Sequence, residues 1–414
     1  MRARYNALKG FEDILPPSSG LWKELEDKAG RVFLSCGYNE IRVPIAESTD
    51  LFARSIGETS DIVSKEMYTF TDKGSRSMTL RPEGTAPVVR AYVEHNLSIL
   101  PPPQKFYYSG PMFRYERPQK GRQRQFHQIG VECFGAGAPE ADAEVIYMLC
   151  RFLEAAGVRD FRLDVNSIGD DKCRPAFRQR LVDFFAPVKN ELCPDCQRRY
   201  EQNPLRILDC KVPRCVELRA NAPAITDSLC DECRAHYDSV LGFLDTLGIK
   251  YNKNPLLVRG LDYYTRTTFE ARSSLLGAQD AFAAGGRYDG LVEEFGGPST
   301  PAVGFAVGME RLAGMLEGNA VLPVMDAFIA YIGNGTPQRA LKLAAGLREN
   351  GCRVELGFGG SLKSQLRKAD KHGARFAFII GEEEMASGMV KWKDLRQHTS
   401  GETPERDAGL LLKT

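Results

Sequence analysis

The sequence lacks any long hydrophobic run. Although 43% of its 414 residues are hydrophobic, no stretch approaches the roughly 20 apolar residues that a membrane-spanning helix needs. The opening residues, MRARYNALKGFEDILPP, contain acidic side chains and no continuous apolar stretch, unlike a secretion signal. Eleven cysteines without such a signal are typical of reduced thiols in a cytoplasm. We therefore expect a globular, cytoplasmic protein that does not bind a membrane.

The sequence also lacks an excess of either charge. It has 55 basic and 54 acidic residues, which gives a formal net charge of +1. This balance argues against a basic protein that packages DNA, and we expect no DNA partner. Net charge does not report clustering, so local basic patches remain open.

Four common catalytic and nucleotide-binding patterns are absent. The sequence has no GxxxxGK[ST] loop and no GxGxxG that opens a helix after a strand, which disfavours P-loop and dinucleotide folds. It also has no HExxH and no GxSxG. If the protein binds a nucleotide, arginines must therefore hold the phosphates.

The N-terminal part predicts an α+β domain with a largely antiparallel sheet. Apolar residues recur at helical spacing over residues 18–37, where Ser18 or Ser19 can cap a helix and Gly37 can end it. A strand follows in NEIRVPIAE, with Pro44 inside it at an edge or interface. Further strands are predicted in SMTLRPE, QKFYYSGPMFRYE, QFHQIGVECFG, LLVRGLDYYTRTTFEA, DAFAAGGRYDGLV and AVGFAVG.

The pattern changes twice along the chain. Residues 168–253 are helix-like, charged and rich in cysteine, so we interpret them as an insertion into a domain formed by residues 1–167 and 254–323. Strands and helices alternate regularly from residue 324. Residues 324–414 therefore predict a separate small α/β domain with a parallel-type sheet and a polar tail.

The segment FRYERPQKGRQRQFHQIGVE, residues 113–132, combines side chains that suit a nucleotide. Read as two strands, it places Arg114 and Glu116 on one face of the first, and Phe126, Gln128 and Glu132 on one face of the second. Gly130 leaves room between them. An arginine suits a phosphate, and a phenyl ring suits a stacked purine.

Further cations lie in the loop of this segment and at a predicted helix start. The loop carries Arg117, Lys120, Arg122 and Arg124, which suits polyphosphate or the end of a nucleic acid. GMERL places Arg311 near a helix N-terminus, which favours anions. The alternative for the loop alone is a hairpin with a solvated basic surface.

Taken together, these segments resemble the class II aminoacyl-tRNA synthetases. FRYE and the following strand resemble motif 2, GFAVGMER resembles motif 3, and the first helix with EIRVP resembles motif 1, the dimer element. LVRGLDYYTRTTFE (257–270) and AGGRYDGL (284–291) closely resemble the two histidine-specific signatures of histidyl-tRNA synthetases. LRPEGT and KGFEDILP fit the same family, so the resemblance covers nearly the whole chain.

The resemblance implies a role for each matching residue. Histidine would be bound by Glu83, Gly84, Thr85, Gln128, Glu132, Tyr263, Tyr264 and Tyr288. ATP would be bound by Arg114, Glu116, Arg122, Phe126 and Arg311. Arg259 would be a catalytic arginine that faces the α-phosphate, together with Arg114 and Arg311, and Arg117 and Gln119 would contact the tRNA acceptor end.

The same resemblance implies the reaction and the partners. The protein would activate L-histidine with ATP and Mg²⁺ and transfer it to tRNA(His), and it would form a homodimer. The C-terminal domain would bind the anticodon, with Lys363, Arg367, Lys368 and Lys371 as candidates. A solvated helix face is the alternative for those four residues.

Two CxxC pairs predict a structural zinc site. Cys193 and Cys196 form one pair, Cys230 and Cys233 form the other, and paired CxxC is a zinc-ligand spacing. Loosely packed free thiols are the alternative. Two other functions also remain open: a synthetase-like regulatory subunit of ATP phosphoribosyltransferase, and a related synthetase for proline or threonine. Arg259, Arg311 and the C-terminal domain argue against the first, and the two signatures argue against the second.

Overall fold

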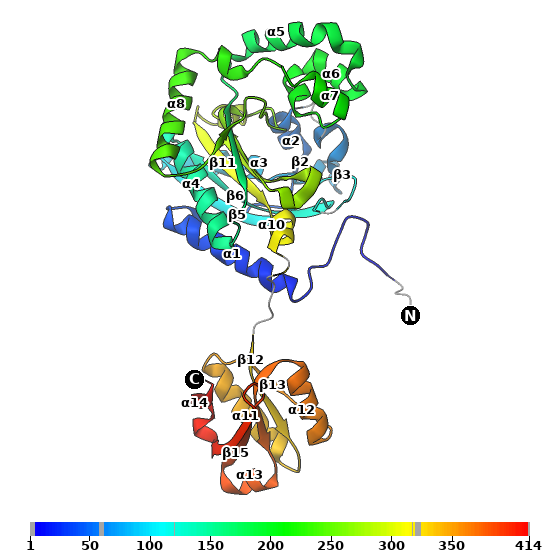
Figure 1. Ribbon diagram of the computed structural model, residues 1–414, viewed down its shortest axis with the longest axis vertical. Helices are drawn as coiled ribbons and strands as arrows, with labels where there is room; N and C mark the ends of the chain where they lie inside the picture. The colour runs from blue at the N-terminus through cyan, green and yellow to red at the C-terminus, as the bar shows by residue number, and fades with distance from the viewer. Residues whose placement is uncertain (1–4, 58–61, 120, 317, 319–323, 413–414) are drawn as a thin grey trace. The chain divides into compact units, whose positions relative to one another are not determined.

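The structure, a computed structural model, describes residues 5–57, 62–119, 121–316, 318 and 324–412 (Figure 1). It divides into two compact units, Met1–Ala320 and Val321–Thr414. Lys120 of the basic loop lies outside the described residues. No helix among the described residues is long and apolar enough to span a membrane.

An eight-stranded sheet forms the centre of the first unit, in the order β1-β5-β6-β11-β10-β9-β7-β8. The edge pairs β1/β5 and β7/β8 are parallel, and all the other pairs are antiparallel. The predicted α+β fold with a largely antiparallel sheet is confirmed. The strands are β1 Asn39–Glu40, β5 Gln104–Phe113, β6 Gln125–Phe134, β7 Arg162–Ser167, β8 Asn252–Lys253, β9 Thr265–Arg272, β10 Ala281–Arg287 and β11 Ala302–Gly308.

Helices cover one face of this sheet, where most of the apolar core lies (Figure 1). They are α1 Ser18–Ser35, α4 Pro139–Ala156, α8 Asp231–Thr246 and α10 Met309–Leu316. Alternate residues of β6, namely Ile129, Val131 and Cys133, are buried in this core. Because side chains alternate along a strand, Gln128 and Glu132 point to the opposite face.

The opposite face carries α3, Thr85–Glu94, which contacts β6. A three-stranded antiparallel sheet and short helices accompany it. These elements are β2 Ala46–Ser48, β3 Tyr68–Thr71, β4 Ser77–Leu80, α2 Thr49–Ile56, α9 Leu291–Glu294, the π-helix η1 Ile62–Glu66 and the 3₁₀-helix η2 Leu97–Ile99. The 3₁₀-helix η6 Ser274–Gln279 instead contacts α10.

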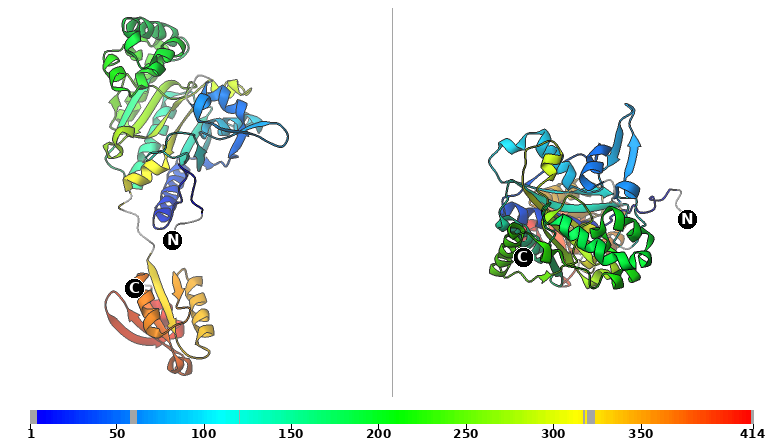
Figure 2. Two further views of the ribbon diagram at one scale, coloured as in Figure 1. Left: turned by 90° about the vertical axis from the view of Figure 1, so that its right-hand side faces the viewer. Right: turned by 90° about the horizontal axis from the view of Figure 1, so that it is seen from above.

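The segment 168–253 is mostly helical, and all of its helices except α8, which packs on α4 and the central sheet, gather at one end of the first unit (Figure 2, left, green). They are α5 Arg174–Phe185, η3 Ala186–Glu191, α6 Pro194–Gln202, η4 Pro204–Asp209, α7 Pro213–Leu218, η5 Ile225–Ser228 and α8. The segment belongs to the first compact unit, so its status as a separate insertion domain stays a prediction.

The second unit has a five-stranded sheet in the order β13-β12-β14-β15-β16. Its strands are β12 Met325–Tyr331, β13 Val354–Leu356, β14 Ala374–Ile380, β15 Met389–Asp394 and β16 Thr399–Pro404. Its helices are α11 Thr336–Glu349, α12 Leu362–Lys371, α13 Glu382–Ser387, η8 Glu405–Asp407 and α14 Ala408–Leu411. The sheet has a core cluster on each side.

Two expectations for this unit are wrong. The sheet is mixed, because β15 and β16 join the parallel strands in antiparallel pairs. These two strands lie in what the sequence presents as a polar tail. Only part of the hairpin is apolar: Val390 is buried, and the Trp392 ring lies on Gly401, where a Cβ atom would approach it to 2.7 Å.

The strand predicted around Pro44 is also wrong. β1 ends at Glu40 and β2 begins at Ala46. Proline has no N–H to donate to a neighbouring strand, and the preceding carbonyl, of Val43, accepts a hydrogen bond from the buried Arg81 side chain at 3.2 Å. Neither predicted serine caps α1, whose N-cap is Pro17, but the helix does end before Gly37, at φ +81°.

Candidate active site

A cavity of about 280 Å³ opens on the face of the sheet that carries Gln128 and Glu132. Nearly all of the predicted histidine and ATP residues line it. They are Glu83, Thr85, Arg114, Glu116, Arg122, Phe126, Gln128, Glu132, Arg259, Tyr263, Tyr264, Tyr288 and Arg311. Residues that are far apart in the sequence therefore form a single site.

Strand β6 brings Phe126, Gln128 and Glu132 to this face by simple alternation, as predicted. The same expectation fails for Arg114 and Glu116, since β5 ends at Phe113. These two residues line the cavity from the loop after the strand. The Arg114 Nε donates to the carbonyl of Pro82 at 2.8 Å, and its guanidinium lies 5.2 Å from the centre of the Phe126 ring.

Glu132 is the most deeply buried acid of the cavity. One of its carboxylate oxygens accepts from the Thr85 hydroxyl at 2.8 Å and from the Tyr108 hydroxyl at 3.3 Å. The other accepts from Tyr288. Burial raises the pKa of Glu132 to about 8, although hydrogen bonds from Tyr288 and Thr85 oppose the shift. This carboxyl can therefore hold or release a proton near neutral pH.

Close backbone approaches shape this part of the cavity. A Cβ atom at Gly84 or Gly130 would lie 2.2 or 2.4 Å from the Tyr108 ring. A Cβ atom at Gly304 would lie 2.1 Å from a Glu132 oxygen. Gly84 does not line the cavity itself, but it allows Tyr108 to reach Glu132. Tyr108 was missed by the sequence analysis, and the space that Gly130 leaves was the signal that could have found it.

Glu83 and Gln128 provide further polar groups nearby. The Glu83 carboxylate accepts from the backbone N–H groups of Thr85 and Ala86, at 2.6 and 2.8 Å, at the start of α3. The Gln128 Oε1 is buried and has no hydrogen-bond partner among the described residues. A buried polar atom without a partner is costly, so Gln128 is poised to contact a ligand.

The other part of the cavity is rich in arginine. Arg122 pairs with Glu116, and Arg114 lies 3.9 Å from the same carboxylate. Arg311 lies in the first turn of α10, as predicted, and donates to the backbone carbonyls of Gly121, at 3.1 Å, and Ala281. Burial and the neighbouring Arg122 lower the pKa of Arg311. Several guanidinium groups that converge in this way suit a polyphosphate.

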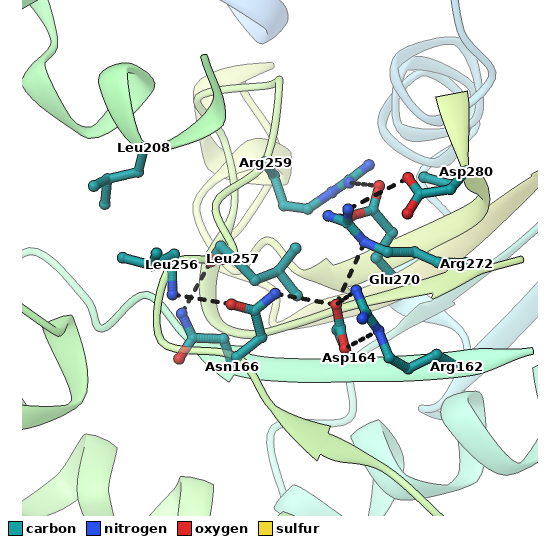
Figure 3. Close-up of polar contacts among 12 residues, drawn as sticks. Arg162, Asp164, Asn166, Leu208, Leu256, Leu257, Arg259, Glu270, Arg272 and Asp280 are labelled. Atoms are coloured by element: carbon teal, nitrogen blue, oxygen red, sulfur yellow. Dashed lines mark hydrogen bonds and ion pairs between the residues drawn. The ribbon is translucent and has the colours of Figure 1, made fainter. Parts of the chain in front are cut away.

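Arg259 lies in an irregular segment before β9, not in the predicted strand. Figure 3 shows its guanidinium beside Glu270, with 3.4 Å between Nη1 and Oε1. Glu270 also accepts from Arg272 at 2.6 Å. The nearby Asp262 instead lies 3.6 Å from Arg206. Arg259 thus lines the cavity, and the Glu270 carboxylate fixes its orientation.

The two residues predicted to contact tRNA lie outside this cavity. Arg117 and Gln119 are exposed, and the Gln119 backbone exchanges two hydrogen bonds with Arg122, at 2.8 and 3.0 Å. Gln119 lines a neighbouring cavity together with Glu12 and His127. The loop therefore connects the arginine-rich part of the first cavity to an outer surface.

The predicted four-cysteine zinc site is not formed. Cys193 and Cys196 belong to one cluster of possible metal ligands, and Cys230 and Cys233 belong to another. Residues that the prediction left out complete each cluster. Sequence spacing correctly paired each CxxC, but it could not show which third and fourth ligands the fold brings to each pair.

Comparison with known proteins identifies the family of this site. The family model for histidyl-tRNA synthetase matches residues 10–169 and 214–312, and an anticodon-binding domain model matches residues 326–408. The chain belongs to the histidyl-tRNA synthetase family. The family match includes the cavity-lining strands β5, β6, β9, β10 and β11, and the two models together follow both compact units.

Individual relatives agree with this family assignment. The chain is 52% identical, over 402 residues and 96% of each chain, to a histidine–tRNA ligase of Thermodesulfovibrio yellowstonii. It is 53% identical, over 92% of this chain and 91% of the relative, to that of Trichlorobacter lovleyi. The crystal structure of apo S. aureus histidyl-tRNA synthetase matches with a TM-score of 0.83 and 39% identity, covering 99% of this chain and 100% of that one.

Proposed function

We propose that the protein acts as a histidine–tRNA ligase. In the first step the carboxylate of L-histidine attacks the α-phosphorus of ATP, which gives histidyl-adenylate and releases pyrophosphate. In the second step the terminal 3′-hydroxyl of tRNA(His) attacks the acyl carbon of the adenylate and releases AMP. Neither step needs an enzyme nucleophile, because positioning and charge stabilisation are sufficient. The family assignment and the composition of the cavity support this function.

We assign the acidic and aromatic part of the cavity to histidine. An imidazole has two nitrogens that need partners, and Glu132 and Tyr264 can each supply one. Tyr263 and Tyr288 would enclose the ring, while Glu83, Thr85 and the unpartnered Gln128 Oε1 would accept from the α-ammonium group. Glu132 supports this assignment because it is buried and lines the cavity.

We assign the arginine-rich part to ATP. Phe126 would stack on the adenine, and the Glu116 carboxylate would accept from its amino group. Arg114, Arg122 and Arg311 would bind the phosphates. Glu270 and Glu310 also line the cavity, and carboxylate oxygens suit Mg²⁺. When it is bound with ATP, Mg²⁺ neutralises charge on the phosphates.

We assign tRNA to two places on the chain. Arg117 and Gln119 would contact the acceptor end, because they lie on the exposed loop beside the arginine-rich part of the cavity. The second unit would bind the anticodon, in agreement with its family match. On helix α12, Lys363, Arg367, Lys368 and Lys371 are all exposed and can contact phosphates.

The predicted homodimer would use α1 and the segment around Pro44. Two large apolar side chains there are exposed, Leu34 at 56% and Ile45 at 44%, which supports a subunit interface with two-fold symmetry. Light scattering at working concentration should give twice the mass of one chain, whereas a fully active monomer contradicts this assignment. The cytoplasmic location stays a prediction.

One observation carries the proposed function: the buried Glu132 carboxyl and four tyrosines share a single cavity with four arginines. ATP–pyrophosphate exchange with each of the twenty amino acids tests it. We expect exchange with histidine alone. Exchange with proline or threonine would indicate a related synthetase, and no exchange by folded protein would indicate a regulatory subunit.

A further inference from the structure

The segment 168–253 contains two separate clusters of possible metal ligands. The first consists of Cys193, Cys196, Cys210 and Cys215, and the second of Asp170, Cys173, Cys230 and Cys233. Within each cluster the candidate ligand atoms all lie within 4.8 Å of one another. The eight residues come from five different places in the segment, so the fold itself has brought them together.

The first cluster joins three short elements. Cys193 is the N-cap of α6 and Cys196 lies in its first turn, Cys210 follows η4, and Cys215 lies in α7. The Sγ atoms of Cys193 and Cys210 are 3.9 Å apart. Zn–S bonds of about 2.3 Å in a tetrahedron place neighbouring sulfurs about 3.8 Å apart. The observed spacing therefore already fits a zinc ion.

The second cluster repeats this local design. Cys230 is the N-cap of α8 and Cys233 lies in its first turn, while Cys173 is the N-cap of α5. In both clusters the first amide of the CxxC pair donates to a sulfur of the other ligands: Cys193 to Cys215 at 3.3 Å, and Cys230 to Cys173 at 3.1 Å. Such N–H···S contacts stabilise a thiolate, which is the form that binds a metal.

We propose that the protein binds two zinc ions in this segment, one at the four-cysteine cluster and one at the cluster of Asp170 with three cysteines. Thiolates with one carboxylate are suitable zinc ligands. All of these cysteines are free thiols, and most are buried. Helices α6 and α7 and the 3₁₀-helix η4 are each nine residues or shorter, so a metal ion stabilises an arrangement that their own length does not.

The two sites have different neighbours. The second adjoins the strand that follows the tyrosines of the cavity: the backbone N–H of Arg266 donates to the Gly169 carbonyl at 2.8 Å, and its guanidinium lies 3.8 Å from Asp170. Arg174, in the first turn of α5 next to Cys173, donates to the carbonyl of Tyr264. The second zinc ion therefore fixes the backbone that positions Tyr264. The first holds α6, α7 and η4 together near another part of the cavity, because Asp209 and Lys211, on either side of Cys210, line it and Arg206 of η4 donates to the Arg259 carbonyl at 3.3 Å.

Metal analysis of the full chain, purified without chelator, tests the two sites. We expect two zinc ions per chain, one in Cys196→Ser and one in Cys233→Ser. Cys36→Ser, which alters a cysteine outside both clusters, is the matched control and should keep two. No zinc, a single zinc in the unaltered chain, or iron in its place overturns the proposal.

A second measurement does not depend on whether the serine variants fold. Cobalt(II) titrated into the chelator-treated, unaltered chain should give thiolate charge-transfer absorption that ends at two equivalents. An endpoint at one equivalent, or no such absorption, contradicts two sites.

The role of the second site rests on the proposed function and is measured separately. We expect Cys233→Ser to raise the histidine KM about fivefold or more. Cys196→Ser should raise it less, because its cluster adjoins Asp209, Lys211 and the Arg259 segment of the cavity and makes no contact with the Tyr264 backbone among the described residues. Equal effects would overturn the link to Tyr264. If the unaltered chain contains two zinc ions but does not activate histidine, the proposed function fails while the metal sites stand.

Discussion

Arg259 and Glu270 form an ion pair beside the cavity, with 3.4 Å between Nη1 and Oε1. Glu270 is itself held by Arg272, which lies 3.4 Å from the buried Asp164 (Figure 3). The Arg259 Nε is buried without a hydrogen-bond partner among the described residues. The ion pair thus fixes the orientation of the Arg259 side chain and leaves one N–H donor for a ligand.

Glu270→Gln tests this arrangement. Glutamine keeps the shape but loses the charge that holds Arg259, and a hydrogen bond to a charged group contributes about 1.5–3 kcal/mol. We expect the exchange rate to fall about tenfold or more, with little change in the histidine KM. The control is Asp280→Asn, because Asp280 contacts Arg272 at 3.4 Å, whereas Arg259 pairs with Glu270. An equal fall in both variants would show general destabilisation.

Glu132→Gln tests the histidine assignment. The variant loses the carboxylate that would accept from the imidazole, so the histidine KM should rise about tenfold to a hundredfold, while the ATP KM changes little. Glu116→Gln, in the arginine-rich part of the cavity, should show the reverse pattern. Steady-state exchange kinetics measure both constants, and unchanged histidine parameters in Glu132→Gln would place the imidazole elsewhere.

The same residue predicts how stability depends on pH. The folded protein raises the pKa of Glu132 from 4.5 to about 8, so the folded state holds the proton more tightly than the unfolded chain. The stability contributed by this proton is present at low pH and is lost as the pH rises through about 8. As the pH rises, the free energy of unfolding of Glu132→Gln should therefore increase relative to that of the original protein, by at most about 1.4 kcal/mol per pH unit. Without histidine, the melting temperatures of the variant and the original protein should diverge between pH 6 and pH 8. Parallel pH dependences would contradict a raised pKa of Glu132.

Arg117→Ala separates tRNA binding from ATP binding. Arg117 is exposed and lies outside the cavity, so its loss should reduce transfer to tRNA far more than ATP–pyrophosphate exchange. Arg122→Ala, which alters a cavity residue of the same loop, should reduce exchange as well. If Arg117→Ala lowers both activities equally, Arg117 contacts ATP instead of tRNA.

The local patterns in the sequence predicted much of the fold and of the site. Alternation along a strand placed Phe126, Gln128 and Glu132 on one face, and helical spacing found α1. These are short-range effects, which a sequence records directly. The Pro44 strand failed because the partner of the Val43 carbonyl is a side chain, Arg81, from a distant segment.

Tertiary contacts account for the remaining errors. The two metal-ligand clusters take Cys210 and Cys215 into one set, and Asp170 and Cys173 into the other, and no spacing rule specifies these partners. Tyr108 reaches Glu132 only because the register of β5 and β6 places it opposite Gly130. Such choices depend on how the elements pack together, which short-range patterns do not specify; the glycine at position 130 was the one local signal for Tyr108.

The claim that one cavity activates histidine is tested most directly by Arg259→His. At the transition state negative charge builds on the α-phosphate, and a preorganised guanidinium stabilises that charge more than the ground state. The variant should melt at the same temperature as the original protein and bind histidine. Its rate of adenylate formation should fall by a factor of about 10²–10³. Transfer from preformed adenylate should suffer less. A folded Arg259→His protein with near-normal ATP–pyrophosphate exchange would contradict this account.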